Sequence, residues 1–365
     1  MNCRILYVVG QLGSGGLEHQ LCWLLQSLDR ERYRPQVVVW RYNPTDTFVA
    51  EIRKLGVPIH SFPATLDGRA KLLALRRLTR RIKPQVIHSY SFHTNIAAWW
   101  AALGTDTVAV GSVRSDFTND KIASGQLLGR LSARWPQAQI FNNFAGAYQA
   151  RYVRSFFAPR QVMVVPNALD LQQYRSTPLS TNGKALIVGI GSLIGVKRWD
   201  RLLNGAGQLK ERGLDFSVEI AGSGPLRETL EQRARKLGIA DRVKFAGEVK
   251  DVPGLLSRST LLAHTSDTEG RPNVVMEAMA CGRAVVAMEA GDIAALVEDG
   301  KTGFVVRRGD NGQLADRLAT LATKRKLCVT MGEASRQKAE KEFGLGQLVD
   351  GTLAAYRAAG WQDPK

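Results

Sequence analysis

The pattern of apolar and polar positions alternates along the whole chain between two kinds of segment. Short runs of valine, isoleucine, leucine and alanine are separated by longer segments in which apolar residues recur at helical spacing. This alternation is typical of a parallel β-sheet whose two faces are covered by helices. The expected strands are residues 4–9, 35–40, 57–62, 86–89, 108–112, 139–142 and 162–165 in the first half, and 185–191, 216–221, 243–246, 260–263, 284–287 and 304–306 in the second.

Helical periodicity fills the segments between these strands. A helical tail is expected from residue 324 to about 359, with a break near 343–346. The other expected helices are residues 17–28, 46–55, 69–82, 94–103 and 124–134 in the first half, and 198–211, 226–237, 252–257, 273–281, 293–298 and 312–323 in the second.

A polar stretch containing proline and glycine, from Pro166 to Gly183, interrupts the alternation and is the expected linker. With 365 residues, the chain is long enough for two ordinary domains. We predict an N-terminal Rossmann-like domain over residues 1–170 and a C-terminal Rossmann-like domain over residues 184–345. Residues 346–365 are predicted to form a helix that packs back toward the N-terminal domain.

The chain lacks the features of a membrane-spanning or exported protein. It contains no run of about 18 consecutive apolar residues, so no membrane-spanning helix is expected. Its first ten residues indicate a strand and not a signal peptide. The four cysteines show no paired spacing and lie in apolar patterns, which favours reduced, buried thiols. These observations predict a cytoplasmic protein.

The net charge of +17 is concentrated in the first half of the chain. Residues 1–170 hold 21 Lys and Arg against 10 Asp and Glu. The densest segment, residues 69–83, places leucines on one helical face and arginines around the other sides. This pattern fits a solvated outer helix or attraction to anionic lipid or a phosphorylated acceptor. The first half lacks the interleaved aromatic and basic residues of RNA-binding modules, and no nucleic-acid partner is expected.

The most informative stretch is residues 266–288, in which Glu269 and Glu277 stand eight positions apart. Pro272 fits the start of a helix, and the residues that follow are apolar on all sides. A carboxylate inside such a helix is costly unless it has a partner. One interpretation is that both acids favour the positive end of a helix, although Glu277 is too deep for a cap. The other is that both face a ligand rich in hydroxyl groups, such as a ribose and a sugar.

Three glycine-rich turns connect expected strands to helices, at residues 10–16, 189–198 and 222–226. Without a Cβ atom, glycine lets backbone amides approach an anion at the start of a helix. Turns of this composition also close ordinary strand–helix loops. None of the three forms a complete dinucleotide-binding fingerprint or a Walker P-loop, which argues against a dehydrogenase or an ATPase.

These segments together resemble the retaining glycosyltransferases of family 4, which have the GT-B fold. The resemblance spans nearly the whole chain and rests most on the E-x7-E block, whose residues are Glu269 to Glu277. The fold implied is α/β, with two doubly wound Rossmann-like domains facing across a cleft. The activity implied is transfer of a sugar from a nucleotide-sugar donor to an acceptor with retention of anomeric configuration. The matching motifs are GGLE, VIHSYSFHTN, VVPNALD, GSLIGVKRWD, IAGSGPL, VKFAGEV and TEGRPNVVMEAMACGRAVV.

The resemblance assigns separate partners to the two glutamates. Glu277 would accept hydrogen bonds from the donor ribose, and Glu269 would contact the transferred sugar. Lys197 would bind the diphosphate, which makes Glu269, Lys197 and His93 the expected catalytic residues. The expected donor-binding residues are Gly15, Gly16, Ser192, Lys197, Arg198, Gly222, Phe245, Gly270, Arg271, Pro272, Asn273, Val274 and Glu277.

One position departs from the family pattern, because an arginine is usual where Ser192 stands. This leaves one phosphate-binding cation unaccounted for. Arg198 or Arg271 could replace it, and Arg271 could instead contact an anionic group on the sugar. The chain contains no Asp-x-Asp, so neither a metal nor another cofactor is expected.

The acceptor is expected to bind the first domain. His93 is expected to open a helix and contact the donor sugar, although a lone histidine is more often structural. His88, Arg114 and Asp116 are the candidate acceptor-binding residues. For Arg114 and Asp116 the alternative is a local ion pair.

The expected partners are a nucleotide-sugar donor, UDP-linked in preference to GDP-linked, and a glycan or polyprenyl-linked acceptor for surface polysaccharide. Contact with anionic lipid would place the enzyme at the inner face of the cytoplasmic membrane. The alternatives are a nucleotide-sugar epimerase or synthase of the same fold, and a non-catalytic binding protein derived from a transferase.

Overall fold

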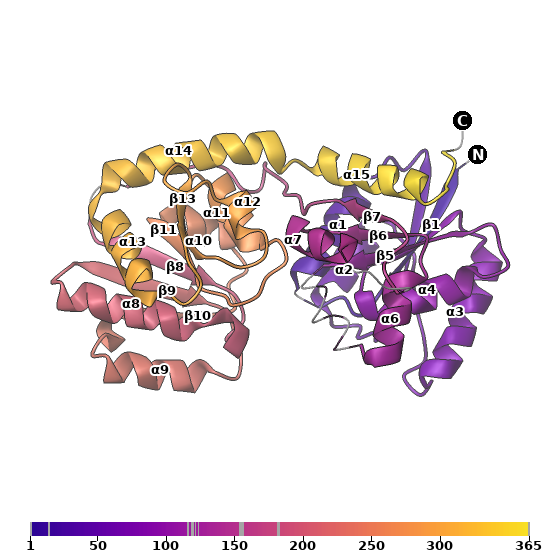
Figure 1. Ribbon diagram of the computed structural model, residues 1–365, viewed down its shortest axis with the longest axis horizontal. Helices are drawn as coiled ribbons and strands as arrows, with labels where there is room; N and C mark the ends of the chain where they lie inside the picture. Colours follow the sequence, from indigo (N-terminus) through magenta and orange to yellow (C-terminus); the bar gives the residue numbers. More distant parts are fainter. Residues whose placement is uncertain are drawn as a thin grey trace. The chain divides into compact units, whose positions relative to one another are not determined.

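The computed structural model of the chain describes residues 2–13, 15–114, 117, 120, 122, 124–152, 157–180 and 183–363. The chain forms two compact units (Figure 1). Unit 1 combines Met1–Ala168 with Leu345–Lys365, and unit 2 is Leu169–Gly344. The last helix therefore belongs to unit 1, and the stretch expected as a linker lies mostly within unit 2.

The described part of unit 1 is built on a parallel sheet. Its strands are β1 (Cys3–Val9), β2 (Tyr33–Val39), β3 (Ile59–Ser61), β4 (Val86–Ser89), β5 (Val108–Val113), β6 (Ala138–Phe141) and β7 (Val162–Val164). They are ordered β3-β2-β1-β4-β5-β6-β7, and every neighbouring pair is parallel. The order reverses between β1 and β4, so the carboxyl ends of these two strands flank the crevice at which sheets of this type bind ligands.

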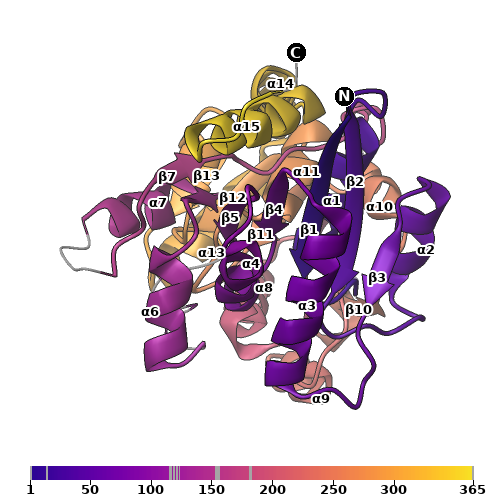
Figure 2. The same ribbon diagram turned by 90° about the vertical axis from the view of Figure 1, so that its right-hand side faces the viewer.

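Helices cover both faces of this sheet. They are α1 (Gly16–Ser27), α2 (Thr47–Lys54), α3 (Gly68–Ile82), the 3-10 turn η1 (Phe92–Thr94), α4 (Asn95–Ala102), α6 (Gln126–Arg134), α7 (Phe144–Arg151) and α15 (Leu345–Ala358). Helices α1, α2 and α15 pack with one set of alternating strand residues, including Ile5 and Tyr7. Helices α3 and α4 lie side by side (Figure 2) and pack with the opposite set, including Leu6 and Val8.

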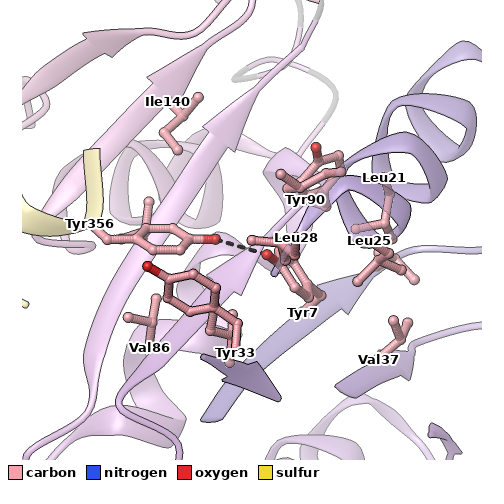
Figure 3. Close-up of a cluster of buried hydrophobic side chains, with 14 of the residues drawn as sticks. Tyr7, Leu21, Leu25, Leu28, Tyr33, Val37, Val86, Tyr90, Ile140 and Tyr356 are labelled. Carbon is pink, nitrogen blue, oxygen red and sulfur yellow. Dashed lines mark hydrogen bonds between the residues drawn. The ribbon is translucent and has the colours of Figure 1, made fainter. Parts of the chain in front are cut away.

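The last helix is joined to the core of unit 1 by a buried tyrosine. The Tyr356 hydroxyl donates to the Tyr7 hydroxyl at 3.3 Å (Figure 3) and also lies 2.8 Å from His88 Nδ1. All three residues are buried, and α15 contacts α1 and β6. A helix far along the chain thus completes the hydrophobic core that the first strand begins.

The described part of unit 2 repeats the architecture. Its strands are β8 (Ala185–Ile190), β9 (Phe216–Ala221), β10 (Val243–Gly247), β11 (Leu261–His264), β12 (Ala284–Met288) and β13 (Gly303–Val306), in the order β10-β9-β8-β11-β12-β13, all parallel. Its helices are η2 (Gly195–Lys197), α8 (Trp199–Glu211), α9 (Arg227–Lys236), η3 (Ala240–Arg242), α10 (Val252–Arg258), α11 (Asn273–Ala280), α12 (Ile293–Leu296), α13 (Asn311–Thr323) and α14 (Arg325–Glu342). The strand order reverses between β8 and β11.

The elements match the expected alternation with two differences. The strand expected over residues 57–62 is shortened to β3, and α7 was not expected. Asn143 caps α7, because its side-chain oxygen accepts a hydrogen bond from the Gly146 amide at 2.6 Å. A side chain at Gly146 would crowd that oxygen, so a residue that usually weakens a helix here makes room for its cap. The tail breaks between α14 and α15, where a break was expected.

Candidate functional site

In unit 2 the strand order reverses between β8 and β11. The loops that follow these two strands bring Glu269 and Lys197 together. Glu269 lies on the loop between β11 and α11, and Lys197 ends η2 after β8. Lys197 Nζ donates to Glu269 Oε1 at 2.6 Å, and His264 Nε2 lies 3.2 Å from the same oxygen. The Lys197 side chain keeps 24% of its surface exposed, so the pair remains partly open to a ligand.

The carboxylate of Glu269 stays ionised at neutral pH. Burial raises its pKa, but the hydrogen bond and charge of His264 and the charge and hydrogen bond of Lys197 outweigh that effect, and the net pKa is about 2. The site therefore presents a fixed negative charge beside an ammonium group.

The loop that carries Glu269 is held by a close backbone approach. The Asp292 amide donates to the Gly270 carbonyl at 2.9 Å. Gly291 has a φ of +51°, and a Cβ atom there would overlap the carbonyl oxygens of Glu269 and Gly270. At the other end of the loop, Pro272 adopts a φ of −70°, and α11 begins at Asn273. Only glycine at 291 permits this packing without strain.

Glu277 lies in the second turn of α11 and is buried. Burial raises its pKa to about 7, although a hydrogen bond with the Tyr174 hydroxyl favours the ionised form. Tyr174 follows the end of unit 1 in the chain and lies in the stretch that was expected to be a linker. A half-ionised carboxyl in an apolar helix is suited to receive hydrogen bonds from a ligand that excludes water.

The two glycine-rich turns of unit 2, residues 189–198 and 222–226, pack closely against each other near Ser192. Gly222 has a φ of +148°, and a Cβ atom there would overlap the Gly191 carbonyl. The Leu193 amide donates to the Ser223 carbonyl at 2.8 Å, and Trp199 Nε1 donates to the Ser192 carbonyl at 3.0 Å. These contacts place the turn after β8 beside Lys197.

The two candidate replacements for the missing arginine are both engaged with carboxylates. Arg198 contacts both oxygens of Asp200 at 3.0 Å and Asp267 at 2.9 Å. Arg271 is 6% exposed and lies 3.4 Å from Asp292 Oδ2. Of the two, Arg198 retains 34% side-chain exposure, whereas Arg271 is enclosed.

Unit 1 has a cavity of about 550 Å³ at its own switch point. Gly10 follows β1, and Tyr90 and His93 follow β4; all three line the cavity together with Arg41 and Arg114. A Cβ atom on Gly10 would lie 2.8 Å from His93 Cε1, so the glycine makes room for the imidazole. Burial and the charge of Arg41 lower the pKa of His93, which keeps it neutral at pH 7.

The structure corrects the role expected for His88. Its side chain is fully buried, and its Nδ1 and Nε2 lie 2.8 Å from the hydroxyls of Tyr356 and Ser112. Burial lowers its pKa well below the usual value. A ring enclosed in this way supports the core and cannot contact an acceptor. Asp116, the other candidate beside Arg114, lies outside the described residues.

The remaining predicted donor residues lie at the start of two helices and within one strand. Gly15 precedes α1 and Gly16 begins it. Phe245 lies in β10, and its carbonyl accepts a hydrogen bond from Arg227 Nη2 at 3.1 Å. Val274 follows Asn273 in the first turn of α11.

Sequence reasoning missed His264 and Tyr174. His264 stands five positions before Glu269 at the end of a buried strand, and this position is the signal that could have found it. Nothing in the sequence pairs Tyr174 with Glu277, because the contact joins residues about a hundred positions apart.

Among the described residues, no group of three or more His, Cys, Asp or Glu is placed to hold a metal ion. In this described part of the chain, none of the helices combines the length and the hydrophobicity of a membrane-spanning segment.

Two family models match the chain in succession. Residues 15–168 match the glycosyl transferase 4-like domain, and residues 172–338 match the glycosyl transferases group 1. The chain belongs to the group 1 glycosyltransferases. The expected GT-B fold is confirmed, because the chain shares it with Anabaena HepE, solved in complex with UDP and glucose. That likeness has a TM-score of 0.82 at 20% identity and covers 98% of this chain and 100% of HepE.

The curated relatives of this glycosyltransferase are similar over part or most of their length. The Bacillus anthracis N-acetyl-alpha-D-glucosaminyl L-malate synthase is 28% identical over 180 residues, which cover 49% of this chain and 47% of that protein. A Campylobacter jejuni alpha-1,4-N-acetyl-D-galactosaminyltransferase, named for a diphospho-undecaprenol-linked acceptor, is 26% identical over 285 residues, or 76% of each chain. The chain spans about half the length of the first two curated relatives it matches.

Proposed function

We propose that this chain transfers a hexosyl group from a nucleotide sugar to a glycan or polyprenyl-linked acceptor in the biosynthesis of surface polysaccharide or glycoconjugate. The observation that carries the proposal is the Glu269–Lys197 pair at the switch point of unit 2. A UDP-sugar is preferred to a GDP-sugar, and the UDP and glucose bound to HepE support that choice. Retention of anomeric configuration is proposed with it.

Lys197 and the backbone amides at the start of α11 act on the leaving group. As the anomeric bond breaks, negative charge develops on the nucleoside diphosphate, and groups already oriented toward it lower the barrier. Arg198 is the second cation proposed for the diphosphate, because it adjoins Lys197 and is the more exposed of the two candidates. Arg271 has a structural role in this proposal, in which it pairs with Asp292 beside the loop that carries Glu269.

The two glutamates keep separate tasks in this proposal. Glu269 is ionised and faces the transferred sugar, where it holds a hydroxyl and favours positive charge at the reacting carbon. Glu277 receives the ribose hydroxyls. His93, a neutral imidazole in the cavity of unit 1, is the third residue proposed to take part in catalysis. We propose no metal cofactor, so excess EDTA should leave the transfer rate unchanged; a rate restored only by added Mg²⁺ would contradict this.

Unit 1 is proposed to contact the anionic inner face of the membrane, where a polyprenyl-linked acceptor would be held. Helix α3 exposes arginines, as expected from the sequence. A second surface was not foreseen, formed by α6, α7 and their flanking residues. Its exposed apolar residues are Ile122, Leu127, Leu128, Phe144, Tyr148 and Tyr152.

The charge of this α6–α7 surface favours an anionic lipid bilayer. From residue 121 to 169 the sequence contains no Asp or Glu, while Arg130, Arg151 and Arg160 are exposed. Arg130 Cζ lies 5.7 Å from the ring centre of Phe157, which ties α6 to the segment after α7. Apolar and aromatic side chains beside arginines are typical of surfaces that lie in the membrane interface.

Flotation with vesicles containing phosphatidylglycerol tests this contact. Leu127→Ser combined with Tyr148→Ser should reduce binding to anionic vesicles at low salt. The matched control is Leu73→Ser, an exposed leucine on α3 outside the α6–α7 surface; because it leaves the arginines of α3 in place, it should bind as the wild type does. Equal binding by all three proteins, or no binding by the wild type, would refute the proposed surface.

Release of nucleoside diphosphate on mixing donor and acceptor tests the catalytic function. A panel of UDP- and GDP-sugars with polyprenyl-linked and free glycan acceptors should give release that depends on both substrates. Conversion of the donor to another nucleotide sugar would favour an epimerase. Donor binding with no turnover on any acceptor would favour the non-catalytic alternative.

A further inference from the structure

Asp267 is bonded to residues on both sides of Lys197. Its backbone amide donates to the Val196 carbonyl at 2.9 Å. Its carboxylate accepts a hydrogen bond from Arg198 Nη1 at 2.9 Å and lies 2.7 Å from Arg201 Nη2. The turn that presents Lys197 is therefore attached to Asp267 both before and after the lysine.

Thr265 adds two bonds from the same loop. Its hydroxyl donates to the Lys197 carbonyl at 2.8 Å, and its own carbonyl accepts from Arg201 Nη1 at 3.1 Å. The Arg201 side chain is 7% exposed, so it forms a buried link between α8 and this loop. Thr265 and Asp267 both lie on the segment after β11 that leads to Glu269. These bonds fix the backbone of Lys197 relative to the loop of Glu269.

The backbone of Arg198 is left-handed, with a φ of +51°. This conformation costs energy in a residue that has a side chain, and it persists only where other contacts hold it. Here Arg198 forms ion pairs with Asp200 and Asp267. Burial raises the pKa of Asp267, but its hydrogen bonds with Arg198 and Arg201 outweigh that effect and lower the net pKa, so the carboxylate is ionised at neutral pH.

A bound donor would compete for both members of the Lys197–Glu269 pair. In the proposed reaction Lys197 turns to the diphosphate and Glu269 to the sugar, so their mutual bond cannot be what holds the two loops in register. The bonds of Asp267 to Val196 and Arg201 involve no proposed ligand contact and can persist when the donor is bound. Groups that are held in place before the reaction lower the barrier most.

We propose that Asp267 is a positioning residue of this site. It holds the turn of Lys197 against the loop of Glu269, so that both side chains keep their places when the donor separates them. Asp267 itself contacts neither the donor nor the reacting atoms in this role. The inference rests on the proposed transferase function and adds to it the residue that aligns its two charged groups.

Asp267→Asn in the full chain tests the inference, because it keeps the size of the side chain and removes its charge. It should lower kcat by about tenfold or more, since small misplacements of reacting groups are that costly. UDP affinity, measured by calorimetry, should change by less than about threefold, because loss of a carboxylate near the diphosphate also removes a repulsion. The matched control is Asp316→Asn, which removes a 2.7 Å pair with Arg212 at the end of α8 and should leave both quantities unchanged.

A double variant separates positioning from stability. In Lys197→Met the side chain that Asp267 places is already absent, so adding Asp267→Asn should lower kcat by less than about threefold further. Single-turnover measurements with enzyme in excess of donor keep these slow rates measurable. If Asp267→Asn does not fold, Thr265→Val, which removes the hydroxyl bond to the Lys197 carbonyl and no charge, should lower kcat by about threefold or more at unchanged UDP affinity.

Wild-type kcat in folded Asp267→Asn, or in Thr265→Val if the first variant does not fold, would overturn the inference. A full further tenfold loss in the Lys197→Met background would do the same, because Asp267 would then act independently of the lysine. Equal losses of kcat and UDP affinity would assign Asp267 to the stability of unit 2. Absence of nucleotide release by the wild type on every substrate would instead defeat the proposed function.

Discussion

Glu277→Gln should make the ligand-free protein more stable above neutral pH while it weakens donor binding. Burial raises the pKa of Glu277 from 4.5 to about 7. At about 1.4 kcal/mol per unit, the difference corresponds to roughly 3 kcal/mol against the ionised form in the folded protein. Glutamine is uncharged and retains an oxygen that can accept the hydrogen bond from Tyr174. The variant therefore avoids the free-energy cost of burying a charged carboxylate and keeps most of the side-chain packing around position 277.

The pH dependence has a definite sign. Below pH 4.5 the carboxyl is protonated in both the folded and the unfolded chain and contributes no difference. Between pH 4.5 and about 7 the folded chain binds the proton and the unfolded chain does not, so the free energy of unfolding falls as pH rises. Above pH 7 the carboxyl is ionised in both the folded and the unfolded chain, and the free energy of unfolding falls no further. The stability advantage of Glu277→Gln should therefore grow across this window and level off near pH 8.

Scanning calorimetry from pH 4.5 to pH 8 measures this advantage. For a unit of this size, about 3 kcal/mol shifts the melting temperature by roughly 6–12 °C. Titration of UDP at pH 8 should show binding weakened by about tenfold to a hundredfold, the usual consequence of losing a hydrogen bond to a charged group. Equal melting temperatures of the two proteins at pH 8, or UDP affinity that the substitution leaves unchanged, would refute the reasoning.

Three further substitutions test the other parts of the site. Glu269→Gln should lower kcat by about tenfold or more while UDP affinity changes little, because the residue is proposed to contact the transferred sugar and not the nucleotide; equal losses of both would contradict its role. Lys197→Met should weaken UDP binding by about tenfold, measured by calorimetry against exposed Lys250→Met, and parallel behaviour of the two variants would count against a diphosphate contact. Gly10→Ala should push His93 aside and lower kcat at an unchanged circular dichroism spectrum, and wild-type turnover would show that the imidazole position is not needed.

The alternation of strands and helices could be predicted because it is a local property. Residues buried on both faces of a parallel sheet are mostly apolar, and the sequence shows this in central strands such as β1, β8, β11 and β12. Helix α7 was not predicted because it is short and contains Gly146. A side chain at position 146 would crowd the Asn143 oxygen that caps the helix, so the glycine leaves room for this cap. The sequence shows a glycine, but only the structure shows which atom would occupy its place.

The candidate site was predicted unevenly for a related reason. Glu269 and Lys197 were found because each belongs to a motif with its own local signature, and the sheet then brought them together. His88 has the same sequence signals as a site residue, yet Tyr356 from the far end of the chain encloses it. Contacts of such long range depend on the packing of whole elements, which periodicity does not encode.

The central claim is that unit 2 holds a nucleotide sugar through Glu277, Lys197 and Glu269. Calorimetric titration of the full chain with UDP and GDP, repeated with Glu277→Gln, tests it most directly. The account predicts that UDP binds the wild type more tightly than GDP does and that the substitution weakens UDP binding by about tenfold or more. Failure of both nucleotides to bind the wild type, or identical UDP affinity in the two proteins, would contradict it.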